Sequence, residues 1–293
     1  MALSQEATGS MPNPITFSCG VAYHAVLRVE AGRLDQYRKS PACAKGTALT
    51  TGFLKHVDAQ TILGMAAIDR AMRDSTFPLD SPMRDLSRWG VIGAPRFLGR
   101  AGLTSVIANF HVEGAWGVSP HHVPHRSLHS FSGTASQAFG MHGPNFGAGG
   151  GPGSEIEGLL AATSTLASSD LPGLWLLVTR VEPELAPVNG CHIDPTSFVE
   201  AIALGLVPRA ASCPLQLALT HGLAANEEAE PFDLGTLAAM LHRLEEGHET
   251  NASLGASGWL TMRPSRKTLA GPHAIERFPS RLAQPVETER RSS

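Results

Sequence analysis

The sequence lacks the features that would direct it into a membrane, out of the cell or onto nucleic acid. Its 293 residues contain no window of about 20 apolar residues, so we expect no transmembrane helix. The N-terminal stretch MALSQEATGSMPNP has no basic region followed by an apolar one, so no signal peptide is indicated and we expect a cytoplasmic protein. The net charge of −3 gives no basis for nucleic-acid binding, which needs a basic face.

Cysteine is scarce and forms no pattern typical of a metal site. The chain has Cys19, Cys43, Cys191 and Cys213, with neither a CxxC pair nor zinc-finger spacing among them. In a chain of this length without an export signal, we expect these residues to be buried, reduced thiols. The cysteines therefore predict no metal site and no disulfide framework.

The composition that is present is that of an ordinary globular protein. Hydrophobic residues make up 42% of the chain and charged residues 17%, which is enough for a large core. We predict a flexible N-terminus over residues 1–13 and a folded domain over residues 14–263. Residues 264–293 mix charges and prolines without periodicity, which predicts a disordered tail.

Strand and helix patterns follow one another along the chain, as is typical of an α/β protein. Alternating residues over 15–21 predict a strand, and Asp58 followed by apolar residues at helical spacing predicts a capped helix over 59–73. The later expected elements are a strand over 88–93, a helix over 101–112, a strand over 174–182, a short helix over 197–206, a strand over 215–219, a helix from Asp233 to Glu246 and a last strand over 256–262.

The stretch from Phe139 to Ser169 combines a turn, a glycine-rich approach and a helix. The turn is Gly143-Pro144-Asn145, and the approach runs from Phe146 to Gly151. We expect Gly151 to be the N-cap and Pro152 the first helical residue, where proline is well tolerated. Six residues then share one apolar helix face: Ile156, Leu159, Leu160, Thr163, Leu166 and Ala167.

These residues resemble the N-terminal half of a β-ketoacyl synthase over roughly residues 50 to 185. The resemblance rests on Val118-Ser119-Pro120, on His142-Gly143-Pro144-Asn145-Phe146, and on the helix that follows. It implies a layered α-β-α, thiolase-like fold, in which a GPN-type turn leads through a short strand to a catalytic cysteine at the start of a buried helix. Leu174 to Glu182 takes the place of a strand ending in Gly-Gly-x-Glu, with Arg180 and Val181 where the glycines would stand.

Laid along this pattern without a gap, Pro152 falls at the position of the nucleophilic cysteine. Condensation by a ketosynthase needs a thiolate, which a helix N-terminus stabilises. Proline has no nucleophilic atom, and the loss of a nucleophile costs on the order of 10⁶ in turnover. We therefore expect no catalytic residue of the ketosynthase type and no cofactor.

The C-terminal half that the resemblance requires is short and degenerate. Active ketosynthases carry two further histidines there, in an HGTGT-type loop and in a later motif, with an NxFGFGG-type run beyond. The segment Thr220-His221-Gly222 with Asn226 matches the first of these only faintly, so we interpret His221 as an ordinary residue at a strand end. The resemblance thus implies a ketosynthase-like N-terminal half with a truncated C-terminal part.

The histidine-rich run from His121 to His129 allows a metal site as one interpretation. A spacing of four would place His121 with His125, and His125 with His129, on one helix face. Pro120 and Pro124 interrupt such a helix, and no carboxylate follows at ligand spacing. We therefore favour a loop and helix start before the GPN-type turn, and predict no metal.

Three hypotheses for function follow from the resemblance and the residues. The first is a non-catalytic subunit similar to the chain-length factors of type II polyketide and fatty-acid-like systems, paired with an active ketosynthase or with itself, and meeting an acyl carrier protein. The second is an acyl transferase or hydrolase that uses Ser154 with a nearby histidine, His142 or His125, although Ser154 fits a helix cap better. The third is a phosphate site at Gly147–Gly153, which Glu155 and Glu157 oppose.

Overall fold

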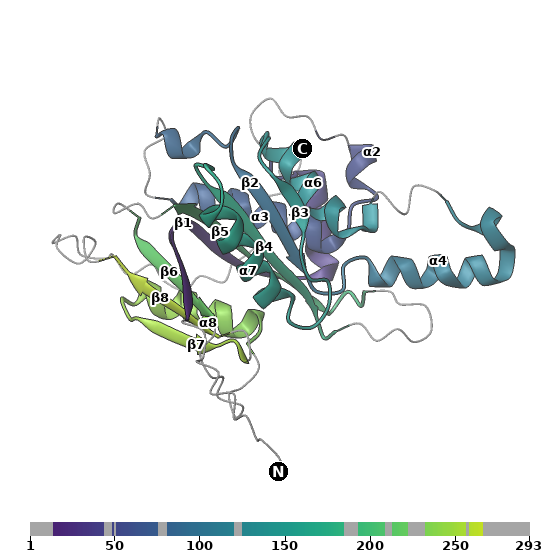
Figure 1. Cartoon of the computed structure of the whole chain (residues 1–293). Coiled ribbons are helices and arrows are strands. Elements are labelled where there is room, and N and C mark those ends of the chain that lie inside the picture. Colours follow the sequence, from purple (N-terminus) through teal and green to yellow (C-terminus); the bar gives the residue numbers. More distant parts are fainter. Residues whose placement is uncertain are drawn as a thin grey trace, which may run out of the picture.

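The computed structural model describes residues 14–43, 49, 51–75, 81–119, 125–184, 193–208, 213–221, 232–255 and 258–265. The flexible N-terminus predicted for residues 1–13 and nearly all of the tail predicted for 264–293 lie outside these ranges, and so does Cys191. The described strands form one eight-stranded sheet in the order β3-β2-β4-β5-β1-β6-β8-β7 (Figure 1). The single domain over residues 14–263 stays a prediction.

The sheet is parallel at one end and antiparallel at the other. Strands β2, β3 and β4 are parallel to one another, whereas each neighbouring pair from β4 through β5, β1, β6 and β8 to β7 is antiparallel. Strand bounds are β1 Ile15–Glu30, β2 Gly90–Pro95, β3 Asn145–Gly147, β4 Leu174–Glu182, β5 Phe198–Pro208, β6 Leu215–His221, β7 Thr250–Ser253 and β8 Trp259–Pro264.

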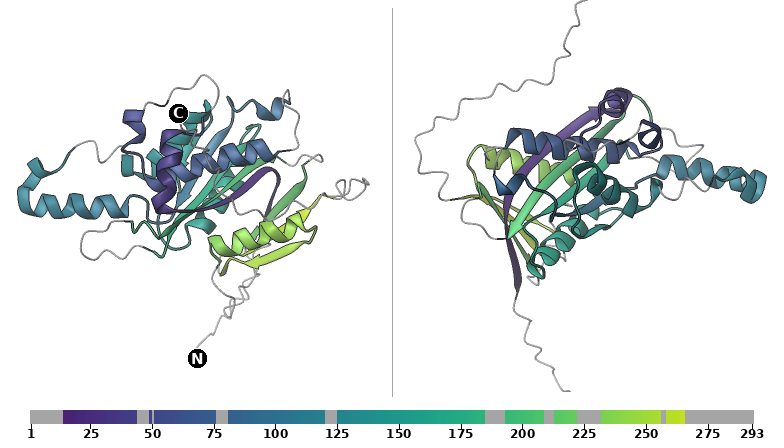
Figure 2. Two further views of the ribbon diagram at one scale, coloured as in Figure 1. Left: turned by 180° about the vertical axis from the view of Figure 1, so that it is seen from behind. Right: turned by 90° about the horizontal axis from the view of Figure 1, so that it is seen from above.

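Helices cover both faces of the sheet, so the fold has three layers (Figure 2). One face carries α3 (Ala59–Asp74) and α6 (Leu128–Phe139), with the short helices α1 (Leu34–Lys39) and α2 (Thr51–Leu54) beside them; the other carries α7 (Ser154–Ala167) and α8 (Leu234–Glu245). Helix α4 (Arg100–Glu113) projects from the body. The 3-10 helices within the described ranges include η1 (Ala31–Arg33), η2 (Pro82–Arg84) and η3 (Gly114–Gly117). The predicted layered α/β fold is thereby confirmed.

The predicted helix caps act as the sequence indicates. The Asp58 carboxylate accepts the amide of Gln60 at 2.9 Å, and α3 begins at Ala59 as expected. The Asp233 carboxylate accepts the amide of Thr236 at 2.8 Å, and α8 follows with an apolar face in the core. Among the described residues, no helix combines the length and the apolar character needed to cross a bilayer.

Two expectations for secondary structure were wrong. Residues 197–206 form no helix but the central strand β5, buried on both faces between β4 and β1. A fully buried strand shows no polar alternation, so its apolar run reads like a helix in sequence. The first strand extends to Glu30, well past the alternating segment, because its second half also pairs with β5.

Candidate functional site

The GPN-type turn is held tightly against the strand β2. The Gly143 amide donates to the Trp89 carbonyl at 3.0 Å, and the Pro144 carbonyl accepts the Val91 amide at 2.9 Å. A Cβ atom on Gly143 would lie 2.6 Å from the Trp89 carbonyl oxygen, which explains why glycine stands there. The turn thus leads directly into β3 at the edge of the sheet, as the resemblance implies.

The glycine-rich loop after β3 places the helix start later than expected. Gly149, Gly150 and Gly153 all have positive φ angles, and Gly153 rather than Gly151 is the N-cap of α7. The helix begins at Ser154, so the prediction that Pro152 is the first helical residue was wrong. The physical reason is that the left-handed Gly153, whose carbonyl accepts the amides of Ile156 and Glu157, sets the start of the helix.

Pro152 lies in an exposed turn immediately before the helix. A Cβ atom built on the neighbouring Gly153 would meet no other atom within 4 Å, so the turn is open to solvent. The residue therefore precedes the helix N-terminus but does not sit in an enclosed site. It supplies neither a nucleophile nor a proton to this end of the molecule.

The structure does not bring Ser154 together with a histidine. The Ser154 side chain is fully buried, and its Oγ has no hydrogen-bond partner. His142 is exposed and precedes β3, whereas Ser154 follows the opposite end of that strand. His125 lies instead against the rings of Phe53 and His56, with ring centroids 5.4 and 5.9 Å away. A serine nucleophile with a base in hydrogen-bond reach is therefore not formed.

Glu155, beside Ser154, is the most unusual ionisable group at this helix start. Its side chain is fully buried, and neither carboxylate oxygen has a hydrogen-bond partner. Burial raises the pKa of the Glu155 carboxyl above its ordinary value, although the guanidinium groups of Arg96 and Arg180 act in the opposite direction. A buried carboxyl of this kind favours its protonated, uncharged form.

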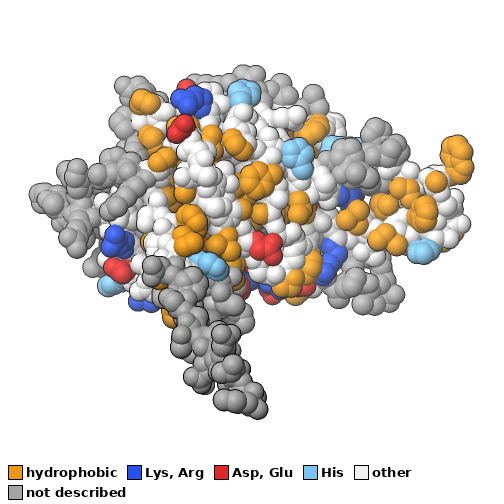
Figure 3. Space-filling view, in the orientation of Figure 1, with side chains coloured by type: hydrophobic (Ala, Val, Ile, Leu, Met, Phe, Trp, Pro, Cys, Tyr) orange, Lys and Arg blue, Asp and Glu red, His pale blue; other side chains and the backbone are white. Residues whose placement is uncertain are grey.

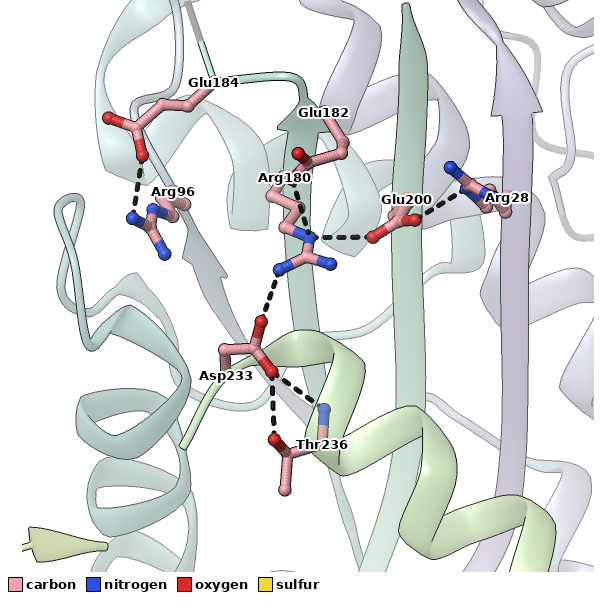
Figure 4. A network of polar contacts seen from close by, with 8 residues as sticks. All are labelled: Arg28, Arg96, Arg180, Glu182, Glu184, Glu200, Asp233 and Thr236. Atoms are coloured by element: carbon pink, nitrogen blue, oxygen red, sulfur yellow. Dashed lines mark hydrogen bonds and ion pairs between the residues drawn. The ribbon is translucent and has the colours of Figure 1, made fainter. Parts of the chain in front are cut away.

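A network of ion pairs lies at the carboxyl end of β4 (Figure 4), and its members Arg180 and Asp233 act electrostatically on Glu155. Arg180 on β4 is its centre, because its guanidinium lies 2.7 Å from Glu200 on β5 and 2.7 Å from Asp233 at the start of α8. Glu200 also pairs with Arg28 on β1 at 2.8 Å. Glu182, which the resemblance singles out, is half-exposed and lies 3.8 Å from Arg180.

A second group of ion pairs, at the same end of the sheet, joins the segments that follow β2 and β4. Glu184 accepts from Arg96 at 2.7 Å and from Arg100 at 3.3 Å. The carboxylates of these two networks are thus paired with guanidinium groups, and Asp233 also accepts the Thr236 hydroxyl at 3.0 Å as part of the helix cap. The ion pairs join strands and segments that are far apart in the sequence at this end of the sheet.

The Arg180 network was missed in the sequence, although a signal for it exists. An arginine stands where the resemblance expects a glycine inside a buried strand, and an arginine in such a place needs a carboxylate partner. Glu200, in the apolar run of residues 198–208, is that partner, but the run was interpreted as a helix and the pairing was not seen.

The glycine loop does not form a phosphate site. In the first turn of α7, the amides of Ser154, Ile156 and Glu157 donate to the carbonyls of Gly151 and Gly153, so they are not directed at a ligand. The two ionisable side chains of this turn, Glu155 and Glu157, are carboxyl groups and supply no positive charge to a phosphate. Both observations favour a structural role for the glycines.

The histidine run and the cysteines show no metal-binding geometry in the described ranges. His121 and His122 lie outside those ranges, and among the described residues no group of three or more histidine, cysteine, aspartate or glutamate side chains converges on one point.

Cys19 and Cys213 are buried free thiols, as predicted, and Cys43 is a half-buried one. Burial, with a smaller effect of Cys213, raises the pKa of Cys19 to about 12, so this thiol is unreactive.

The projecting helix α4 and the 3-10 helix η3, which we call the arm (residues 100–117), carry most of the large hydrophobic side chains that are exposed among the described residues. None of the residues of α4 is buried. The large exposed side chains of the arm are Leu103 (36% exposed), Ile107 (58%), Phe110 (52%), Val112 (83%) and Trp116 (99%). Hydrophobic side chains accordingly cluster on this projection in Figure 3. The helix predicted over residues 101–112 is confirmed, with one further residue at each end.

Comparisons with known proteins find ketosynthases among the solved structures that are similar to this chain. No protein-family model and no curated protein sequence matches the chain. Among solved structures, a complex of the ketosynthase ApeO with its chain length factor ApeC from Xenorhabdus doucetiae is 15% identical, with a TM-score of 0.49, and the match covers 83% of this chain and 99% of that one.

Two further solved structures are of the same kind. A β-ketoacyl synthase from Burkholderia phymatum is 13% identical, with a TM-score of 0.43, over 79% of this chain and 69% of that one. A type II polyketide acyl-carrier protein in complex with its ketosynthase, AntDE:AntF, is 14% identical with a TM-score of 0.42; the match covers 66% of this chain and 63% of that one, which is less than two thirds of its length. These three solved structures are of ketosynthases, one of them in complex with its chain length factor and one with its acyl-carrier protein.

Proposed function

We propose that this chain is a non-catalytic, ketosynthase-like subunit that pairs with an active ketosynthase in polyketide- or fatty-acid-type biosynthesis. The observation that carries the proposal is the arm, a helix without one buried residue that presents large apolar side chains to solvent. Such a surface needs a cover, and a partner subunit provides one.

The chemistry at the start of α7 supports a role without catalysis. Pro152 has no nucleophilic atom, and Ser154 is buried without a histidine in reach. The charged groups nearby form ion pairs with one another. Condensation would therefore have to be carried out by the partner, and this chain would shape or stabilise the pair.

The energetics of the arm support a role in pairing. A helix of 14 residues is marginally stable in water unless it packs against something, and α4 packs against little of its own chain. Only Arg100 and Glu113 at its ends carry a full charge, and the interval between them is mostly apolar and small residues, with Asn109 and His111 as the larger polar ones. Burial of Ile107, Phe110 and Trp116 in a partner would supply about 1.5–3 kcal/mol for each fully buried side chain.

The partner we propose is an active ketosynthase, as in the pairing of a ketosynthase with its chain length factor that the ApeO–ApeC structure contains. An acyl carrier protein is the further partner expected of such a pair. A homodimer of this chain is the competing assembly, and the oligomeric state of the isolated chain distinguishes the two.

The test is co-expression of this chain with an intact ketosynthase encoded beside it, followed by size-exclusion chromatography. We expect a single co-eluting complex with the wild-type chain. The double variant Ile107→Asp/Phe110→Asp should separate the two proteins, because it places two charges in the apolar contact.

The matched control is Ser105→Asp/Asn109→Asp, which adds the same two charges to polar, exposed positions of the same helix. It should leave the complex intact. Separate elution of the two wild-type proteins would contradict the proposal, and so would a complex that both double variants leave unchanged.

A further inference from the structure

The strand β1 has one edge that is only half covered. On one side β5 pairs with it from Cys19 to Glu30, but on the other side β6 pairs with it only from Ile15 to Val21. Among the described residues, no strand continues this second side along His24–Val29. In an antiparallel strand the backbone N–H and C=O groups of every second residue point to the side away from a given partner, so this edge presents unpaired groups.

A groove of about 770 Å³ lies along this open edge. Its lining includes every residue from His24 to Val29, although successive side chains of a strand point to opposite faces. A cavity can contact the side chains of both faces only if it faces the edge of the strand. The floor of the groove is therefore the unpaired backbone of β1, about 20 Å long at 3.4 Å per residue.

Two helices on opposite faces of the sheet form the walls of the groove. Arg70, Ala71 and Asp74 of α3 line one side, and Ala238, Leu241, His242 and Glu245 of α8 line the other. Figure 2 shows β1 running between these two helices. A second copy of the chain carries the same two helices beside its own β1, so it cannot present that strand without bringing these helices into the groove.

The charges in the groove are already matched within the chain. Arg70 pairs with Asp74, His24 lies 3.2 Å from Glu245, and Arg28 pairs with Glu200. On the face of β1 that carries α3, the strand contributes the apolar residues Ala25, Leu27 and Val29 to the groove. On the opposite face it contributes Val26, which is 43% exposed. A ligand here needs an extended backbone and small apolar side chains, and it needs no net charge.

We infer that this groove binds one extended, uncharged peptide segment of another protein, which adds a strand to β1 in line with β6. Main-chain hydrogen bonds to the open edge supply the affinity, and a side chain at every second position of the peptide packs against Leu27 and Ala71. The inference stands apart from the proposed function, since it uses neither the arm nor the start of α7.

The probe is a short, capped, fluorescently labelled peptide with valine at every second position and threonine between, titrated into the full chain and followed by anisotropy. We expect saturable binding. The same peptide with N-methylated backbone amides should bind at least about tenfold more weakly, equal to about 1.4 kcal/mol, because it cannot complete the ladder.

Two neighbouring alanines of α8 provide matched protein variants. Ala238 lines the groove, whereas Ala239 is exposed and does not. Ala238→Arg should weaken binding at least about tenfold, and Ala239→Arg should leave it within about twofold, with the same thermal stability for both. Hydrogen exchange of the β1 amides should be fast in the free chain and slow with the peptide.

Several outcomes would overturn the inference. They are the absence of saturable binding, equal binding of the N-methylated peptide, and equal loss of binding in both alanine variants. Slow exchange of the β1 amides in the free full-length chain would show that the chain itself already fills the groove, and would overturn it as well.

Discussion

Helices α7 and α4 have the same length and the same kind of start but opposite environments. Each spans 14 residues and follows a left-handed glycine N-cap, Gly153 or Gly99, without a side-chain cap. Helix α7 buries seven residues in the core, and α4 buries none. The two helices therefore differ in what stabilises them: α7 is held by the core of the described chain, whereas α4 exposes large apolar side chains.

The largest predicted effect is the difference in stability between one variant in α7 and one in α4. Leu159→Ala in α7 removes a fully buried side chain and should lower the free energy of unfolding by about 3 kcal/mol. Ile107→Ala in α4 should change it by less than about 0.5 kcal/mol, because Ile107 is 58% exposed. Urea unfolding of the isolated chain measures both. Equal losses of stability would show that α4 packs on its own chain, and they would contradict the contrast between a buried and an exposed helix.

The next effect concerns the ion pairs beside α7. Arg180→Met leaves Glu200 and Asp233 without their shared partner and should destabilise the chain by about 2–3 kcal/mol, below the value for a fully buried pair because the Asp233 side chain is 36% exposed. Arg180→Lys, which keeps the charge, should recover part of the loss. An Arg180→Met variant as stable as the wild type would show that the network contributes nothing to the fold.

A smaller effect depends on pH and comes from Glu155. Burial raises the pKa of its carboxyl, so the native state holds the proton more tightly than the unfolded chain does. Stability should therefore fall as the pH rises above the unfolded-state pKa of about 4.3 and through the raised native value. Glu155→Gln should remove this loss and be more stable than the wild type at pH 8, by about 1–3 kcal/mol.

The control for that prediction is Glu157→Gln, which changes an exposed carboxyl in the same first turn of α7. It should follow the wild-type dependence on pH. Unfolding of the three proteins in urea at pH 5 and pH 8 gives the comparison. If Glu155→Gln and the wild type lose stability in parallel, the buried carboxyl is not the group that titrates.

The smallest effect on stability should come from Pro152→Cys, which restores a thiol at the exposed turn. We expect a change of less than about 0.5 kcal/mol in the free energy of unfolding. The new thiol should react rapidly with iodoacetamide, whereas Cys19, whose pKa burial raises to about 12, should not. No condensation of acyl thioesters is expected from the thiol alone; turnover would show that only the nucleophile had been lost.

The sequence was informative wherever a local signal sets the structure. Asp58 and Asp233 marked two helix starts, and the apolar run of residues 174–182 gave β4 with the predicted bounds. The failures have non-local causes: β5 is buried on both faces and so carries no strand periodicity, and the start of α7 depends on the left-handed conformation of Gly153. The exposure of the arm and the open edge of β1 depend on what does not pack against them, which no local pattern encodes.

The most direct test of the account is hydrogen exchange of α4 and α7 in the free chain and in the presence of the active ketosynthase. In the free chain, α4 should exchange rapidly and α7 slowly, because only α7 is packed in the core. Addition of the ketosynthase should slow the exchange of α4 by about tenfold or more and leave α7 unchanged. Exchange of α4 that the ketosynthase does not alter, or that is already slow in the free chain, would contradict the account.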